Sequence, residues 1–116
     1  MTDLQNIIEA SFEHRAEITP RNVEPHVKEA VLEAINLLDS GQARVAEKKQ
    51  GQWVVNEWLK KAVLLSFRIE DNSLIQGGFA NFYDKVPTKY NDFSAHEFRE
   101  SGVRVVPPAT VRKGVH

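Results

Sequence analysis

The stretch RVAEKKQGQWVVNEWLKKAVLLSF, residues 44–67, decides the fold. Two short β-prone runs flank Lys49-Gln50-Gly51, an arrangement typical of a β-hairpin. A helix is predicted from about Asn56 to Phe67, because asparagine is a good N-cap. Its wide apolar face comprises Trp58, Leu59, Ala62, Val63 and Phe67. A hairpin that leads directly into an amphipathic helix indicates a small α+β domain.

Two further helices are predicted before this stretch. Residues 2–16 carry apolar side chains at helical spacing, and Thr2 and Gln5 have the spacing of a capping box. Proline is favoured in the first helical turn, so a second helix is predicted from Pro25 to about Asp39. We expect the two apolar stripes to pack on each other or on a common sheet.

The residues after the third helix predict shorter elements. Residues 73–76 are a possible strand that ends at Gly77-Gly78, and Pro87 indicates that residues 79–90 are irregular or form an edge. A short helix is predicted at residues 94–101, capped by Ser94.

A β-prone run, Val103–Val106, follows this helix, and Pro107-Pro108 predicts extended backbone. The whole order of elements predicts a small α+β domain with an extended tail.

Composition excludes several functional classes. The chain has 116 residues, a formal net charge of −1 and no cysteine, which argues against a nucleic-acid surface, a disulfide framework and a cysteine nucleophile. The four histidines are scattered, so no metal site is predicted, and Trp53 and Trp58 are expected in the core. The apolar run Ala62–Leu65 is too short to span a membrane, and the start does not resemble a signal peptide. We therefore expect a cytoplasmic protein without a nucleic-acid or membrane partner.

Arg104 is a candidate binding residue, because it lies between apolar neighbours in VRVVPP, residues 103–108. A strand here would place Arg104 and Val106 on one face. Its guanidinium offers planar, paired donors that suit a carboxylate ligand. The alternative is an edge-strand arginine paired with an acid of the same chain.

Lys85 and Lys89 form a second candidate, since they flank a turn fixed by Pro87 among several aromatic residues. One interpretation is a semi-rigid loop over an anionic ligand. The other is a loop anchored by its aromatic residues, with both lysines solvated.

Four long stretches together resemble one family. They are LQNIIEASFEHRAEITP (4–20), RVAEKKQGQWVVNEWLKKAVLLSFRIEDN (44–72), GGFANFYDKVPTKY (77–90) and FRESGVRVVPPATVRKG (98–114). This pattern is similar to the amino-terminal region of 2,3,4,5-tetrahydropyridine-2,6-dicarboxylate (tetrahydrodipicolinate) N-succinyltransferases. The resemblance covers essentially the whole chain.

The resemblance implies an acyltransferase of the hexapeptide-repeat type. A helical domain, here residues 1–101, would precede a left-handed parallel β-helix, with residues 102–116 as its lead-in. The enzyme would be a homotrimer that transfers succinyl from succinyl-CoA to tetrahydrodipicolinate in lysine and diaminopimelate biosynthesis. The product would be N-succinyl-2-amino-6-oxopimelate. Succinyl-CoA would serve as a co-substrate, and no tightly bound cofactor is implied.

The resemblance also implies which residues act. Arg104 matches a substrate-binding arginine of the family, whereas no firm role transfers to Lys85 or Lys89. No catalytic residue is expected within residues 1–116, so this piece alone is expected to be inactive. The alternative is a stand-alone binding or assembly module of the same fold. Hexapeptide repeats encoded after His116 would favour the enzyme, and a stop codon would favour the module.

Overall fold

The structure, a computed structural model, describes residues 2–116, apart from the side chain of Thr2. The described chain is flat, with extents of 42 × 40 × 19 Å. Its elements in chain order are α1 (Thr2–Phe12), the 3₁₀ turn η1 (Arg15–Glu17), α2 (Pro25–Asp39), β1 (Ala46–Lys49), β2 (Gln52–Val55), α3 (Glu57–Ile69), β3 (Ser73–Gln76), β4 (Asn81–Asp84) and α4 (Ala95–Ser101). This order confirms a small, helix-rich α+β domain.

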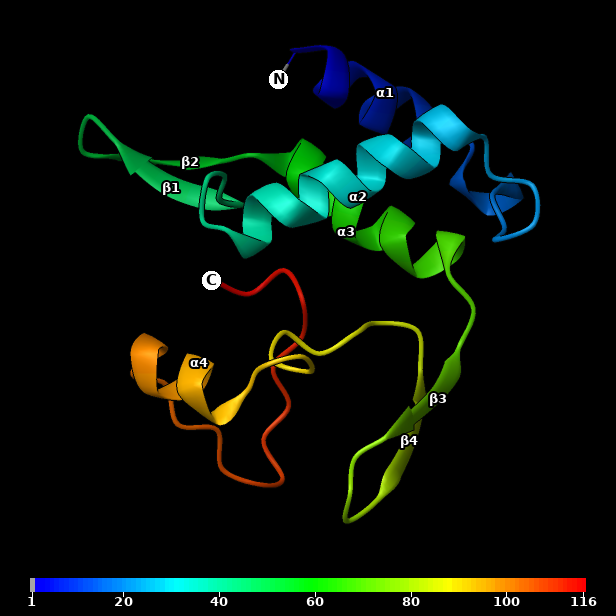
Figure 1. Ribbon diagram of the computed structural model, residues 1–116. Coiled ribbons are helices and arrows are strands. Elements are labelled where there is room, and N and C mark those ends of the chain that lie inside the picture. Colours follow the sequence, from blue (N-terminus) through cyan, green and yellow to red (C-terminus); the bar gives the residue numbers. More distant parts are fainter. Residues whose placement is uncertain (1) are drawn as a thin grey trace.

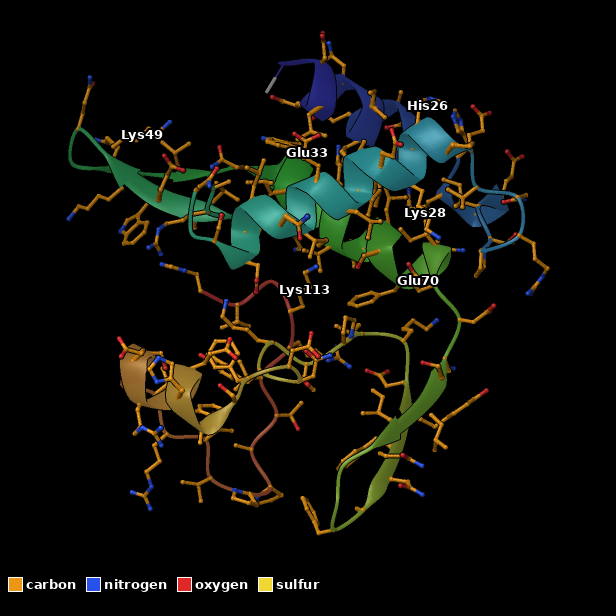
Figure 2. All side chains as sticks on the ribbon, in the orientation of Figure 1. His26, Lys28, Glu33, Lys49, Glu70 and Lys113 are labelled. Atoms are coloured by element: carbon orange, nitrogen blue, oxygen red, sulfur yellow. The ribbon has the colours of Figure 1, made fainter. Side chains whose placement is uncertain are left out.

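The core lies between α1, α2 and α3, which pack against one another as one layer (Figure 1). Each helix contributes an apolar stripe, and these stripes pack on one another. For the first two helices this is one of the two expected arrangements, the other being packing on a common sheet. The largest fully buried side chains are Ile8, Val31, Leu59, Leu65 and Ile69. At the edge of this layer, Lys28 of α2 lies beside Glu70, which follows α3 (Figure 2).

The helix boundaries differ from the prediction at two places. α1 ends at Phe12 instead of residue 16. Just after this end, the Arg15 side chain bends back, donates to the Phe12 carbonyl at 3.0 Å and lies over the Phe12 ring. α3 continues to Ile69, because that side chain is also buried in the core. α2 has the predicted bounds. The predicted cap at Thr2 lies outside the described side chains.

The first hairpin is confirmed, with Lys49 paired to Gln52 next to the turn. Gln50 and Gly51 both have positive φ, as a tight type I′ connection requires. Trp53 was wrongly expected in the core: it is 70% exposed. The hairpin extends beyond the helical layer (Figure 1).

A second hairpin pairs β3 with β4, with Ile75 opposite Phe82. The turn at Gly77-Gly78 is confirmed, since the Gly77 amide donates to the Ala80 carbonyl at 2.8 Å. The segment expected to be irregular or an edge contains β4, which is an edge strand because its sheet has only two strands among the described residues. Pro87 does not disturb it, because β4 ends at Asp84.

The short helix α4 begins with the predicted capping box. Ser94 accepts a hydrogen bond from the Glu97 amide at 3.2 Å, and the Glu97 carboxylate accepts one from the Ser94 amide at 3.1 Å. A cap of this kind satisfies amides that have no partner within the helix.

Replacement of Ser94 by alanine is expected to destabilise α4 by about 1 kcal/mol. None of its residues is buried, so the loss should stay local. Carbon-13 chemical shifts of residues 95–101 should move toward coil values, while Ser94→Asp, which keeps an acceptor, should preserve them. Unchanged shifts in Ser94→Ala would show that the cap is dispensable.

The predicted strand at Val103–Val106 is wrong, because these residues pair with no described strand. The extended backbone predicted at Pro107-Pro108 is also wrong. The two prolines lie in a turn, with a cis peptide bond between them, and the Ala109 amide donates to the Val106 carbonyl at 2.8 Å. A strand is stable only beside a neighbour, and prolines donate no ladder hydrogen bonds.

Candidate functional site

Arg104 lies on the exposed segment that follows α4. Gly102 ends this helix in the left-handed conformation, with φ of 73°, and turns the chain toward Arg104. The side chain of Arg104 makes no hydrogen bond or ion pair with any residue from 2 to 116. The structure therefore shows neither the edge strand nor the acid partner of the alternative interpretation. In the described chain its donors remain available to a ligand.

Lys85 and Lys89 hold the second half of the chain against the helical layer. The Lys85 ammonium donates to the Phe67 carbonyl in the last turn of α3 at 3.0 Å. The Lys89 ammonium donates to both the carbonyl and the carboxylate of Asp39, at the end of α2, at 2.9 Å. Cations at helix C-termini satisfy free carbonyls and oppose the negative end of the helix dipole.

These contacts differ from the interpretation in which both lysines are solvated. Each ammonium donates a hydrogen bond to the end of a helix, and the Lys89 side chain is only 18% exposed. Neither ammonium shares a hydrogen-bond partner with Arg104 among the described residues. Their positions indicate an anchoring role, and a contact of either lysine with an anionic ligand stays a prediction.

Asp39 is the residue that the sequence interpretation missed. Its carboxylate accepts hydrogen bonds from Lys89 and from the Gly114 amide, each at 2.9 Å. Burial raises its pKa, but these hydrogen bonds and the charges of Lys89 and Lys113 outweigh burial, so the pKa lies below its ordinary value of 3.8. A signal was present: an aspartate in the last position of a helix opposes the dipole and needs a cation.

Asp39 therefore connects α2 to the C-terminal segment, and this connection predicts a pH dependence. Because the folded pKa is lowered, the contact stabilises the folded chain above the unfolded pKa, near 3.8, and is lost as pH falls through the folded pKa. Protection of the Gly114 amide from hydrogen exchange, corrected for intrinsic rates, should decrease over this range.

Asp39→Asn is the matched variant, since it keeps an acceptor but cannot titrate. It should show no such transition in Gly114 protection. An identical pH profile in both proteins would assign the transition to another group.

A second ion pair fixes the base of the β3–β4 hairpin to the same segment. Arg112 donates to the Asp84 carboxylate at 3.1 Å, and Thr88 pairs with Arg112 as an isolated antiparallel bridge. The Lys85 amide, the Val86 amide and Arg112 lower the pKa of Asp84 despite partial desolvation. The residues around 88 and 112 are thereby held side by side.

Two cavities flank these contacts. The larger, about 730 Å³, lies between α2 and α3 on one side and residues 84–88 and 112–115 on the other. The smaller, about 250 Å³, lies between the β3–β4 hairpin and residues 105–112. Arg104 lines neither cavity. Asp84 and Arg112 line both and neutralise each other, so the cavities offer mainly apolar contact.

Within residues 2–116 no cluster of three or more histidine, cysteine or acidic side chains is arranged to hold a metal ion. In the same range no helix has the length and apolarity needed to traverse a lipid bilayer.

A comparison with protein families shows the class of protein to which this chain is related. The family model described as "Tetrahydrodipicolinate N-succinyltransferase N-terminal" matches residues 3–69, which comprise α1, α2, the first hairpin and α3. The helical layer is thus the amino-terminal domain of this class of transferase. The chain belongs to the tetrahydrodipicolinate N-succinyltransferase family.

Individual relatives extend the match to nearly the whole chain. It is 68% identical over 114 residues to the 2,3,4,5-tetrahydropyridine-2,6-dicarboxylate N-succinyltransferase of Thioalkalivibrio sulfidiphilus. The proteins of that name from Aeromonas hydrophila and Nitrosomonas europaea are 64% and 63% identical over 114 residues. Each match covers 98% of this chain and 42% of the relative. The chain therefore spans less than half the length of these relatives.

Proposed function

We propose that this chain is the amino-terminal part of an enzyme that transfers succinyl from succinyl-CoA to tetrahydrodipicolinate, in lysine and diaminopimelate biosynthesis. The observation that supports this most strongly is 68% identity over 114 residues to a protein with that activity in its name. The alignment covers 98% of the chain, so it extends beyond the family model into the segment that carries Arg104.

In this proposal Arg104 binds one carboxylate of the substrate. A guanidinium donates two parallel hydrogen bonds to a carboxylate, and such charge-assisted pairs are stronger than neutral ones. Arg104 is exposed and has no partner within residues 2–116, so it can accept a ligand without first breaking an ion pair.

The arginine contributes orientation to the reaction. With the carboxylate fixed, the substrate amine, released when water opens the ring, is aligned with the thioester carbonyl carbon, which lowers the entropic part of the barrier. The amine nitrogen forms the new amide bond, the carbon–sulfur bond breaks, and CoA leaves as the thiol after it takes up the amine proton. The base that moves this proton and the oxyanion donors belong, in our proposal, to residues outside 1–116.

The remaining features of the proposal follow the family resemblance. Residues 102–116 lead into a left-handed β-helix, the full protein is a homotrimer, and it acts in the cytoplasm without a tightly bound cofactor. A fixed path for this lead-in is supported by the hydrogen bond from the Gly114 amide to Asp39 at the end of α2. The Lys113 amide also donates to the Pro87 carbonyl, in the loop that Lys85 and Lys89 anchor to the helical layer.

The proposal is tested by assay of the full-length gene product. CoA release from succinyl-CoA should depend on added tetrahydrodipicolinate, and residues 1–116 alone should release none. Absence of dicarboxylate-dependent release by the full-length protein would reject the enzyme and favour a binding or assembly module. Release by residues 1–116 alone would show that the reacting groups lie within this domain.

A further inference from the structure

The helix that precedes Arg104, α4, has few contacts with the other helices and strands. Among the described elements, α4 packs extensively against no other helix or strand. It stands apart from the α1–α3 layer in Figure 1. The position of Arg104 therefore depends on the few contacts that hold α4.

An aromatic cluster of Tyr90, Phe93 and Phe98 provides the first of these contacts. Phe98 of α4 lies 5.6 Å from Tyr90 and 5.2 Å from Phe93, measured between ring centroids, and the two loop rings are 4.8 Å apart. These separations are in the range of favourable aromatic pairs. Tyr90 follows Lys89, which is bound to α2, so the cluster links α4 to the anchored part of the chain.

The C-terminal cap of α4 continues the connection to Arg104. The Phe98 carbonyl accepts hydrogen bonds from the Gly102 amide and from the Ser101 hydroxyl, both at 3.0 Å. The Ser101 oxygen accepts in turn from the Val103 amide at 3.3 Å. Ser101 thus fixes the backbone immediately before Arg104.

We propose that Phe98 and Ser101 are positioning residues for Arg104. Phe98 sets the place of α4 through its ring, and Ser101 sets the direction in which the chain leaves the helix. An arginine whose backbone is held in this way loses less freedom when its side chain binds a carboxylate, which favours binding. The inference rests on the proposed function, because its effect is expressed as affinity for the dicarboxylate.

The chain contains a matched control for Ser101. Ser40-Gly41 directly follows α2, and Ser101-Gly102 lies at the end of α4; both glycines have positive φ. The Ser40 hydroxyl donates to the Leu37 carbonyl at 3.2 Å and accepts from the Gln42 amide at 3.4 Å. The two serines make the same local bonds, but only Ser101 precedes Arg104.

The test compares Ser101→Ala, Ser40→Ala and Ser101→Thr in the full-length protein, with both substrates varied. We expect Ser101→Ala to raise KM for the dicarboxylate about threefold to tenfold, the factor typical of one lost hydrogen bond, with KM for succinyl-CoA and kcat little changed. Ser40→Ala should leave all three constants near those of the wild type, and Ser101→Thr, which keeps a hydroxyl, should restore them. Phe98→Leu should also raise KM for the dicarboxylate.

The outcomes separate this inference from the proposed function. If the wild type lacks dicarboxylate-dependent CoA release, the proposed function fails and the inference falls with it. If the wild type is active and Arg104→Lys raises KM, but Ser101→Ala and Phe98→Leu both match the wild type, only the positioning roles are overturned. An equal rise in Ser40→Ala, or equal effects on both substrates, would overturn them as well.

Discussion

Replacement of Arg104 by lysine in the full-length protein is expected to lower kcat/KM for the dicarboxylate by about tenfold to a hundredfold. Lysine keeps the positive charge but presents a point charge in place of a planar fork. The lost bidentate bond corresponds to about 1.5–3 kcal/mol, the usual contribution of a hydrogen bond to a charged group. The loss should appear in KM for the dicarboxylate, because Arg104 binds a substrate carboxylate, and also in kcat, because the amine is less well aligned with the thioester.

Arg99→Lys provides the control for this experiment. Arg99 is also an exposed arginine of this region, on α4, and makes no ion pair within the described chain. Steady-state kinetics with each substrate varied should give values near the wild type for Arg99→Lys. Wild-type kinetics for Arg104→Lys would remove Arg104 from the binding site.

The second large effect concerns the helical layer. Leu65 of α3 is fully buried between α1 and α2, and Leu65→Ala is expected to destabilise the domain by about 2–5 kcal/mol. This loss combines the transfer free energy of the removed methyl groups with the cavity that they leave. For a domain whose total stability is on the order of 5–15 kcal/mol, it is a large fraction.

Leu64→Ala is the matched control, because Leu64 is the neighbouring leucine on the same helix and is 43% exposed. Urea unfolding followed by the fluorescence of the buried Trp58 should give a much lower midpoint for Leu65→Ala and a small shift for Leu64→Ala. Equal shifts in the two variants would contradict the assignment of the core.

The helical layer was predictable from sequence because its signals are local. Pro25 marks the start of α2, and Asn56 directly precedes α3, although its side chain does not make the predicted cap hydrogen bond. The apolar spacing identifies most of the buried face of each helix, although the fully buried Leu65 lies outside the face predicted for α3. The pair Gln50-Gly51 identifies the turn of the first hairpin. Each of these features depends on residues a few positions apart.

The second half was less predictable because its contacts join distant residues. Lys89 and Gly114 meet at Asp39, 50 and 75 positions away in sequence. Nothing near Val103–Val106 in sequence reveals that no strand lies beside it, so β-propensity alone gave the wrong structure. Propensity describes the fit of a residue to a sheet, and it does not supply the neighbouring strand.

The same limit applies to the candidate site. Residue type and spacing identified Arg104 as a group able to bind a carboxylate, and they gave Lys85 and Lys89 as a second candidate for an anionic ligand. The structure assigns both lysines to helix ends, which leaves Arg104 as the cation of the three without a described partner. Only the folded arrangement distinguishes a cation that anchors the chain from one that faces solvent.

The most direct test of the central claim is a crystal structure of the full-length protein with its dicarboxylate bound. We expect two guanidinium nitrogens of Arg104 to lie about 2.7–2.9 Å from the two oxygens of one substrate carboxylate. A guanidinium directed away from the ligand, or paired with an acid of the protein, would contradict the account.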